Sequence, residues 1–174
     1  MTTPEELKKY VRDVPDFPQK GIVFRDITPL LGDKKIFKEA VELMSKAWLE
    51  NPPDLVAGIE ARGFIPGAAI SVRLGAGFVP IRKTGKLPWM TVMETYDLEY
   101  GTDQLEVHSD AVQPGQKVLI VDDVLATGGT ASAAVRLMRK LGADVVGVQV
   151  LIELGYLDGR KKLQDVKLVS EILY

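Results

Sequence analysis

The sequence predicts an α/β fold with a mainly parallel central sheet flanked by helices. Short apolar runs rich in β-branched residues occur at residues 55–59, 77–81, 118–121 and 145–152, and segments with helical spacing separate most of them. Parallel strands buried on both faces have such continuous apolar runs, and helices connect them. The chain has 174 residues, the size of one domain, so we expect a single domain over residues 1–174.

The N-terminal residues predict a short helix and then an irregular segment. Thr3 and Glu6 have the spacing of a capping box, so we expect a helix that runs to about Arg12. Prolines interrupt residues 14–18, and residues 21–27 form a short apolar stretch that contains two charges.

Three further helices are predicted by the 3.6-residue period of apolar side chains. The first begins after Asp33, continues to Trp48 and is stopped by residues 51–53, which contain two prolines. The others cover residues 63–74 and 129–141, and a glycine follows each of them.

Between residues 81 and 115 this alternation of strand and helix stops. Residues 82–88 are basic and contain glycine, whereas residues 91–96 and 104–108 alternate weakly between apolar and polar. This pattern predicts a two-stranded excursion that projects from the sheet. It is either a mobile lid or a plain surface hairpin.

Composition excludes several classes of function. The chain has no cysteine and one histidine, His108, which excludes disulfides, thiol nucleophiles and two-histidine zinc motifs. The net charge of −2 argues against a nucleic-acid surface, and the longest uncharged stretch, residues 124–135, is too short to cross a membrane. Because the N-terminus is acidic and lacks a signal-peptide pattern, we expect a cytoplasmic protein without nucleic-acid or membrane partners.

The candidate site is the segment VLIVDDVLATGGT at residues 118–130. An apolar strand ends in Asp122 and Asp123, and a loop of small residues then opens a helix. Backbone N–H groups of such a loop, together with the helix N-terminus, bind anions, and Thr127 and Thr130 add hydroxyls. A phosphate monoester fits this loop, and the two carboxylates would face either sugar hydroxyls or a divalent cation.

Two familiar nucleotide motifs do not account for this segment. The chain contains no GxxxxGK[ST] string, and Gly75-Ala76-Gly77 precedes a strand and is followed by Pro80, which does not fit a dinucleotide site. A glycine-rich turn without any ligand is the remaining alternative.

The segment VLIVDDVLATGGT resembles the phosphoribosyl-pyrophosphate (PRPP) motif of the type I phosphoribosyltransferases, and its LATGGT form is similar to that of the adenine-specific members. FPQKGIVFRDITPLL resembles their base-recognition segment, EARGF their pyrophosphate loop, and RKTGKLP with YDLEYGTDQLEVH their lid. The match runs in order from about residue 12 to residue 155.

This resemblance implies the type I phosphoribosyltransferase fold, with a small N-terminal hood at about residues 1–32 and a mobile lid hairpin at about residues 82–108. It also implies the reaction of adenine with PRPP to give AMP and pyrophosphate, in purine salvage. The resemblance further implies a homodimer. It also implies Mg²⁺ that is bound with PRPP, without a direct protein ligand to the metal.

The resemblance gives each segment a role. The 5′-phosphate would bind to Ala126, Thr127, Gly128, Gly129 and Thr130. The ribose hydroxyls would face Asp122 and Asp123. Pyrophosphate would bind to Glu60, Ala61, Arg62, Arg82, Lys83 and Lys86, although a solvated surface position is the alternative for Lys86. Adenine would contact the backbone of Val23 and Arg25 and the side chains of Phe24 and Leu125, although Phe24 could equally be core packing.

Loss of pyrophosphate from the sugar should pass through a cationic state, for which positioned charge and exclusion of water matter more than a nucleophile. By resemblance Glu99, beside Tyr100, handles the proton on the purine nitrogen, and Arg62 is the third catalytic residue. His108 is expected to be a non-catalytic strand residue. Trp89 and Met90 depart from the family pattern at the lid tip, a difference that bears on lid kinetics and leaves the assignment of the reaction unchanged.

Two other functions stay open. One is the same fold acting on another purine base, against which Val23-Phe24-Arg25 argues. The other is a regulator that senses PRPP or a purine, which should carry a DNA-binding segment or a basic face.

Overall fold

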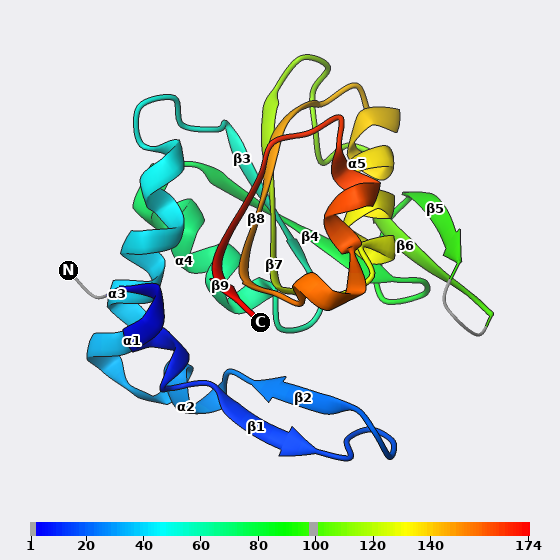
Figure 1. Cartoon of the computed structure of the whole chain (residues 1–174). Helices are drawn as coiled ribbons and strands as arrows, with labels where there is room; N and C mark the ends of the chain where they lie inside the picture. Colours follow the sequence, from blue (N-terminus) through cyan, green and yellow to red (C-terminus); the bar gives the residue numbers. More distant parts are fainter. Residues whose placement is uncertain (1–2, 98–100) are drawn as a thin grey trace.

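The computed structural model describes residues 3–97 and 101–174 (Figure 1). Seven strands form one sheet in the order β5-β6-β4-β3-β7-β8-β9. Strands β4, β3, β7, β8 and β9 are parallel, whereas β5 and β6 are antiparallel. The bounds are β3 Leu55–Ile59, β4 Gly77–Lys83, β5 Thr91–Asp97, β6 Thr102–His108, β7 Lys117–Leu125, β8 Asp144–Glu153 and β9 Leu168–Leu173. The predicted α/β fold is confirmed.

Helices cover both faces of the sheet, and a hydrophobic core lies on each. Helix α5 (Gly129–Lys140) packs on one face, where Leu137 and Met138 are fully buried against Ile120 and Val148. Helices α3 (Lys34–Ser45) and α4 (Phe64–Leu74) lie on the other face, and the 3-10 turn η1 (Lys46–Trp48) follows α3. The three helices predicted from apolar spacing are therefore confirmed, with ends shifted by a few residues.

The N-terminal prediction is only partly right. The capping box of Thr3 and Glu6 is present, but α1 (Pro4–Lys8) ends before Arg12. Strand β1 (Arg12–Pro15) follows and pairs antiparallel with β2 (Val23–Asp26), and α2 (Thr28–Gly32) comes next. Ion pairs between the two strands explain why β1 forms: Arg12 pairs with Asp26, and Asp13 pairs with Arg25. Opposite charges on facing positions stabilise strand pairing. Figure 1 shows this hairpin beyond the end of β9.

The hairpin of β5 and β6 continues the sheet, where the sequence predicted an excursion projecting from it. Strand β6 pairs with β4 through Arg82 and Lys83, opposite Glu106 and Leu105. Leu105 and Val107 are buried in the core under α5. The base of the predicted lid is therefore part of the folded core.

Residues 155–173 form elements that the sequence did not indicate. Short 3-10 helices η2 (Gly155–Leu157) and η3 (Gly159–Leu163) follow β8, and β9 then completes the sheet edge. In the parts of the chain that the structure describes, no helix combines the length and apolar character needed to cross a membrane.

Candidate active site

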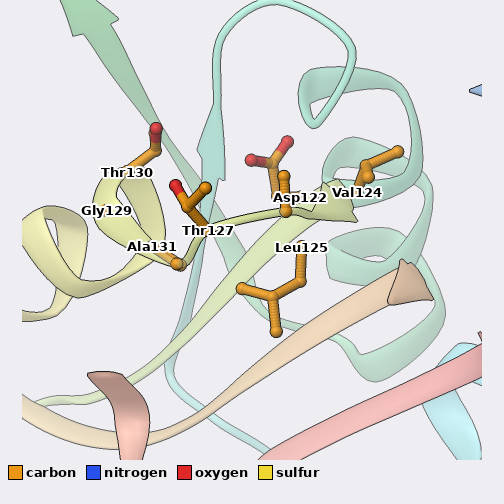
Figure 2. A pocket seen from close by; sticks show the side chains of 9 residues that line it. Asp122, Val124, Leu125, Thr127, Gly129, Thr130 and Ala131 are labelled. Atoms are coloured by element: carbon orange, nitrogen blue, oxygen red, sulfur yellow. The ribbon is translucent and has the colours of Figure 1, made fainter. Parts of the chain in front are cut away.

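Two adjoining cavities lie at the carboxyl end of β7, where the chain passes into α5, and Figure 2 shows the residues that line the smaller one. The smaller has a volume of about 80 Å³ and is lined by Asp122 and residues 124–131. The larger, of about 340 Å³, shares Asp122, Val124 and Thr130 with it, so the two meet at the strand end. The rest of the larger cavity is lined by Glu60, Ala61, Arg62, Lys83, Tyr96, Asp103, Leu105 and Asp123.

The smaller cavity is formed by the loop between β7 and α5. Gly128 precedes α5 with a φ of 77°, a left-handed conformation that glycine adopts without strain. The first N–H groups of α5 lack partners within the helix and carry partial positive charge. Figure 2 shows the Thr127 and Thr130 side chains and the Asp122 carboxylate on one side of the loop. The five residues predicted to bind a phosphate therefore lie together: Ala126, Thr127, Gly128, Gly129 and Thr130.

The two adjacent carboxylates have different surroundings. Asp123 is 4 % exposed, and its Oδ2 lies 2.7 Å from Nε of Arg62. Asp122 lies against Gly63 and lines both cavities. Burial, and secondly the charge of Asp123, raise the pKa of Asp122 well above its usual value. Asp122 Oδ1 accepts a hydrogen bond from the backbone N–H of Asp123 at 2.9 Å, and the side chain also borders both cavities, where a ligand can reach it.

Arg62 connects the acidic pair to the N-terminal hairpin. Besides its ion pair with Asp123, its guanidinium carbon lies 4.5 Å from the centre of the Phe24 ring. Phe24 also meets Phe17 edge to face, at 5.1 Å between ring centres. Phe24 therefore contacts a residue that lines the larger cavity, in addition to packing within the hairpin.

The basic side chains predicted to bind pyrophosphate are paired with carboxylates. Glu60 accepts hydrogen bonds from Nε of Arg82 (3.1 Å), the backbone N–H of Lys83 (2.8 Å) and the Lys86 ammonium. Burial acts to raise the pKa of Glu60, but these partners outweigh it and the pKa lies below the usual value. The Lys83 ammonium lies 2.8 Å from Asp103. An anion entering the larger cavity would compete with these carboxylates for the cations.

Comparison with known proteins agrees with this geometry. The phosphoribosyl transferase domain model matches residues 28–173. An adenine phosphoribosyltransferase of Thermotoga maritima is 59 % identical over 97 % of this chain and 98 % of its own length. The chain belongs to the adenine phosphoribosyltransferase family.

Solved structures of the family have the same fold. The crystal structure of the enzyme from Thermoanaerobacter pseudethanolicus is 53 % identical, with a TM-score of 0.96 over 99 % of this chain and 100 % of that one. The enzyme from Saccharomyces cerevisiae, solved with adenine and an imino-altritol bisphosphate, is 38 % identical, with a TM-score of 0.91 over 97 % of this chain and 98 % of that one.

Within this phosphoribosyltransferase, the remaining predicted residues have varied positions. Val23, Phe24 and Arg25 lie on β2, and the Arg25 side chain turns to Asp13 and to the Tyr174 ring. The Leu125 side chain is 2 % exposed and packs in the core, so it offers little of the apolar surface expected for a base. Figure 2 shows it on the side of the strand opposite Asp122.

Two predicted catalytic residues, Glu99 and Tyr100, lie outside the described residues. His108 is a strand residue, as predicted: it ends β6, and it is not among the residues that line the two cavities. The sequence analysis missed Tyr96 and Asp103, which line the larger cavity from the hairpin. Side chains along a strand alternate between its two faces, and this alternation was the available signal. It predicts which side chains of the hairpin share the face toward the cavity.

Proposed function

We propose that this protein is an adenine phosphoribosyltransferase that converts adenine and PRPP into AMP and pyrophosphate. The observation that carries the proposal is the shared wall of the two cavities, where Asp122 lies between an anion-binding loop and a group of cations. A ligand with a phosphate at one end and a pyrophosphate at the other matches these charges. The names of the relatives support the same reaction.

The smaller cavity would hold the 5′-phosphate. Its donors are backbone N–H groups at the start of α5 and the hydroxyls of Thr127 and Thr130. The ribose hydroxyls would then lie at Asp122, where they can donate hydrogen bonds to the partly buried carboxylate. Asp123 would act mainly through Arg62, with which it is paired.

Pyrophosphate would occupy the larger cavity, where Arg62 and Lys83 line the wall. Arg82 and Lys86 are held next to it by Glu60. Among the described residues no group of three or more acidic or histidine side chains is placed to hold a metal ion. We propose that Mg²⁺ is bound with PRPP, without a direct protein ligand, as the resemblance implies. Mg²⁺ brought in with PRPP would neutralise charge on the departing pyrophosphate.

Adenine would lie beside Phe24, with the backbone of Val23 and Arg25 reading its edge. The contact between Phe24 and Arg62 supports this position, because it brings the hairpin to the wall of the larger cavity. The Saccharomyces cerevisiae relative was solved with adenine.

In the reaction, the bond from the sugar carbon to pyrophosphate breaks and a bond to the purine nitrogen forms. Positive charge develops on the sugar, where Asp122 and Asp123 can stabilise it. The proton on the purine nitrogen would leave to Glu99, with Tyr100 beside it, and residues 82–108 would exclude water as a lid. These roles of Glu99 and the lid rest on the resemblance.

A comparison of purine bases tests the assignment. Adenine, hypoxanthine, guanine and xanthine are each mixed with PRPP, Mg²⁺ and protein, and nucleotide formation is followed. We expect AMP from adenine to form at least about 100-fold faster than the other nucleotides, since missed hydrogen bonds discriminate strongly. Preference for another base would favour the alternative substrate, and a shift of nucleic acid in a gel without AMP would favour the regulator.

We also propose a cytoplasmic homodimer, as the resemblance implies. Sedimentation equilibrium should give twice the 19.1 kDa mass of the chain.

A further inference from the structure

The loop that forms the smaller cavity is backed by a segment far along the chain. A Cβ placed on Gly128 would lie 2.3 Å from the carbonyl oxygen of Gly159. A Cβ placed on Gly159 would lie 2.1 Å from the carbonyl oxygen of Ala126 and 2.9 Å from the nitrogen of Gly128. The two backbones therefore touch, and neither position has room for a side chain.

Gly159 is held in place by the residue that follows it. Nε and Nη2 of Arg160 donate to the two carboxylate oxygens of Glu153, at 2.9 and 2.5 Å, and Ser170 donates to the same carboxylate at 2.6 Å. Such a two-pronged pair fixes both side chains in direction as well as distance. The hydrogen bond from Arg160 is the first cause that holds the pKa of Glu153 below its usual value.

Glu153 in turn is anchored to the strand that carries the loop. It ends β8 opposite Leu125, the last residue of β7, and the N–H of Leu154 donates to the Leu125 carbonyl at 2.9 Å. The pair of Arg160 and Glu153 thus closes a ring of contacts from the end of β7, through β8 and η3, back to Gly128.

We propose that Gly159 and Arg160 are positioning residues for the 5′-phosphate subsite, and this inference rests on the proposed function. The contact of Gly159 with the loop holds Gly128 in its left-handed conformation. The N–H groups of the loop therefore converge before the ligand binds. Loss of this contact lets the loop change conformation, and the affinity for a sugar phosphate then falls. Adenine binds elsewhere and is unaffected.

The test compares binding of ribose 5-phosphate by calorimetry in the wild type and in Arg160→Lys, Arg160→Met and Gly159→Ala. This probe carries the phosphate but neither base nor pyrophosphate. We expect a loss of roughly tenfold in affinity for Arg160→Met and more for Gly159→Ala, a tenfold loss being about 1.4 kcal/mol. Arg160→Lys, which keeps the charge but not the two-pronged contact, should fall between wild type and Arg160→Met.

Arg139→Met is the control, because Arg139 also pairs with a carboxylate, Asp165, but on the exposed surface at the far end of α5. It should leave the affinity unchanged. In turnover assays the KM for PRPP should rise in Arg160→Met, while the KM for adenine at saturating PRPP changes less than about twofold. Thermal unfolding of each variant identifies loss of fold, and Ser170→Ala provides a milder variant with a smaller expected loss.

Unchanged ribose 5-phosphate affinity in folded Arg160→Met or Ser170→Ala variants would overturn the inference, as would equal rises in both KM values. No binding by the wild type would overturn it together with the phosphate site. Binding by the wild type without any AMP formation would instead reject the proposed function, and the variant comparison would still decide the inference.

Discussion

The Asp122 carboxylate rests directly on Gly63. A Cβ on Gly63 would lie 2.7 Å from Oδ1 of Asp122 and 2.5 Å from the carbonyl oxygen of Ile59. The glycine before α4 thereby makes room for the carboxylate at the end of the neighbouring strand, so the two strand ends β3 and β7 share one site.

Gly63→Ala should push Asp122 from its position. We expect a loss of about 1–3 kcal/mol in the free energy of unfolding, typical of overpacking, and a fall in turnover. Gly32→Ala is the control, because nothing lies within 4 Å of a Cβ at Gly32. Urea unfolding and initial-rate assays measure both effects. Equal stability of the two variants would contradict the contact described.

Asp122→Asn should stabilise the protein while it lowers activity. Burial raises the pKa of Asp122 in the folded protein above the usual 3.8, so its charge destabilises the fold at neutral pH. At pH below 3.8 the group is protonated in both folded and unfolded states, and the gain from Asn vanishes. The gain should therefore grow as pH rises through the window between the usual and the raised pKa.

Urea unfolding of Asp122→Asn and wild type at pH 4 and pH 8 checks this sign. Asp165→Asn is the control, since its exposed carboxylate has a pKa lowered by Arg139 and should give no such gain. A gain for Asp122→Asn that shrinks with rising pH would show that the carboxylate is not destabilising.

Tyr174 should increase the affinity for adenine, because it holds Arg25 of the β1–β2 hairpin. Its ring lies 3.8 Å from the guanidinium carbon of Arg25 and 3.9 Å from the ammonium of Lys8. Cation–π contacts of this kind contribute about 0.5–2 kcal/mol. Tyr174→Leu should therefore raise the KM for adenine several-fold and leave that for PRPP nearly constant, while Tyr174→Phe keeps the ring and behaves as wild type. Equal effects of Phe and Leu would refute a role for the ring face.

Glu99→Ala should lower kcat by about 10² to 10⁴, the usual contribution of general acid–base help, without a change in thermal stability. His108→Gln should retain activity and serves as the comparison. Wild-type turnover in Glu99→Ala would remove this residue from the proposed mechanism.

The sequence predicted the central architecture because its signals were local. The apolar run at residues 55–59 coincides with β3, and the glycine after α4, Gly75, adopts the left-handed conformation expected at a helix end. The loop residues from Ala126 to Thr130 belong to one contiguous motif, which predicted that they lie together. They line one cavity, as expected.

The features that the sequence did not indicate depend on contacts between separate segments. Strand β1 is four residues long and contains Pro15, so only its pairing with β2 makes it a strand. The backing of Gly128 by Gly159 joins two segments that no local pattern relates. The contact of Leu125 with the base stays a prediction from the motif, and the burial of its side chain in the core depends on how the sheet packs.

The stoichiometry of the reaction tests the proposed function most directly. Purified protein is mixed with adenine, PRPP and Mg²⁺, and AMP and pyrophosphate are measured together over time. We expect both to form at equal rates and each molecule of adenine consumed to give one AMP. Release of pyrophosphate without AMP, or binding of PRPP and adenine without any product, would contradict it.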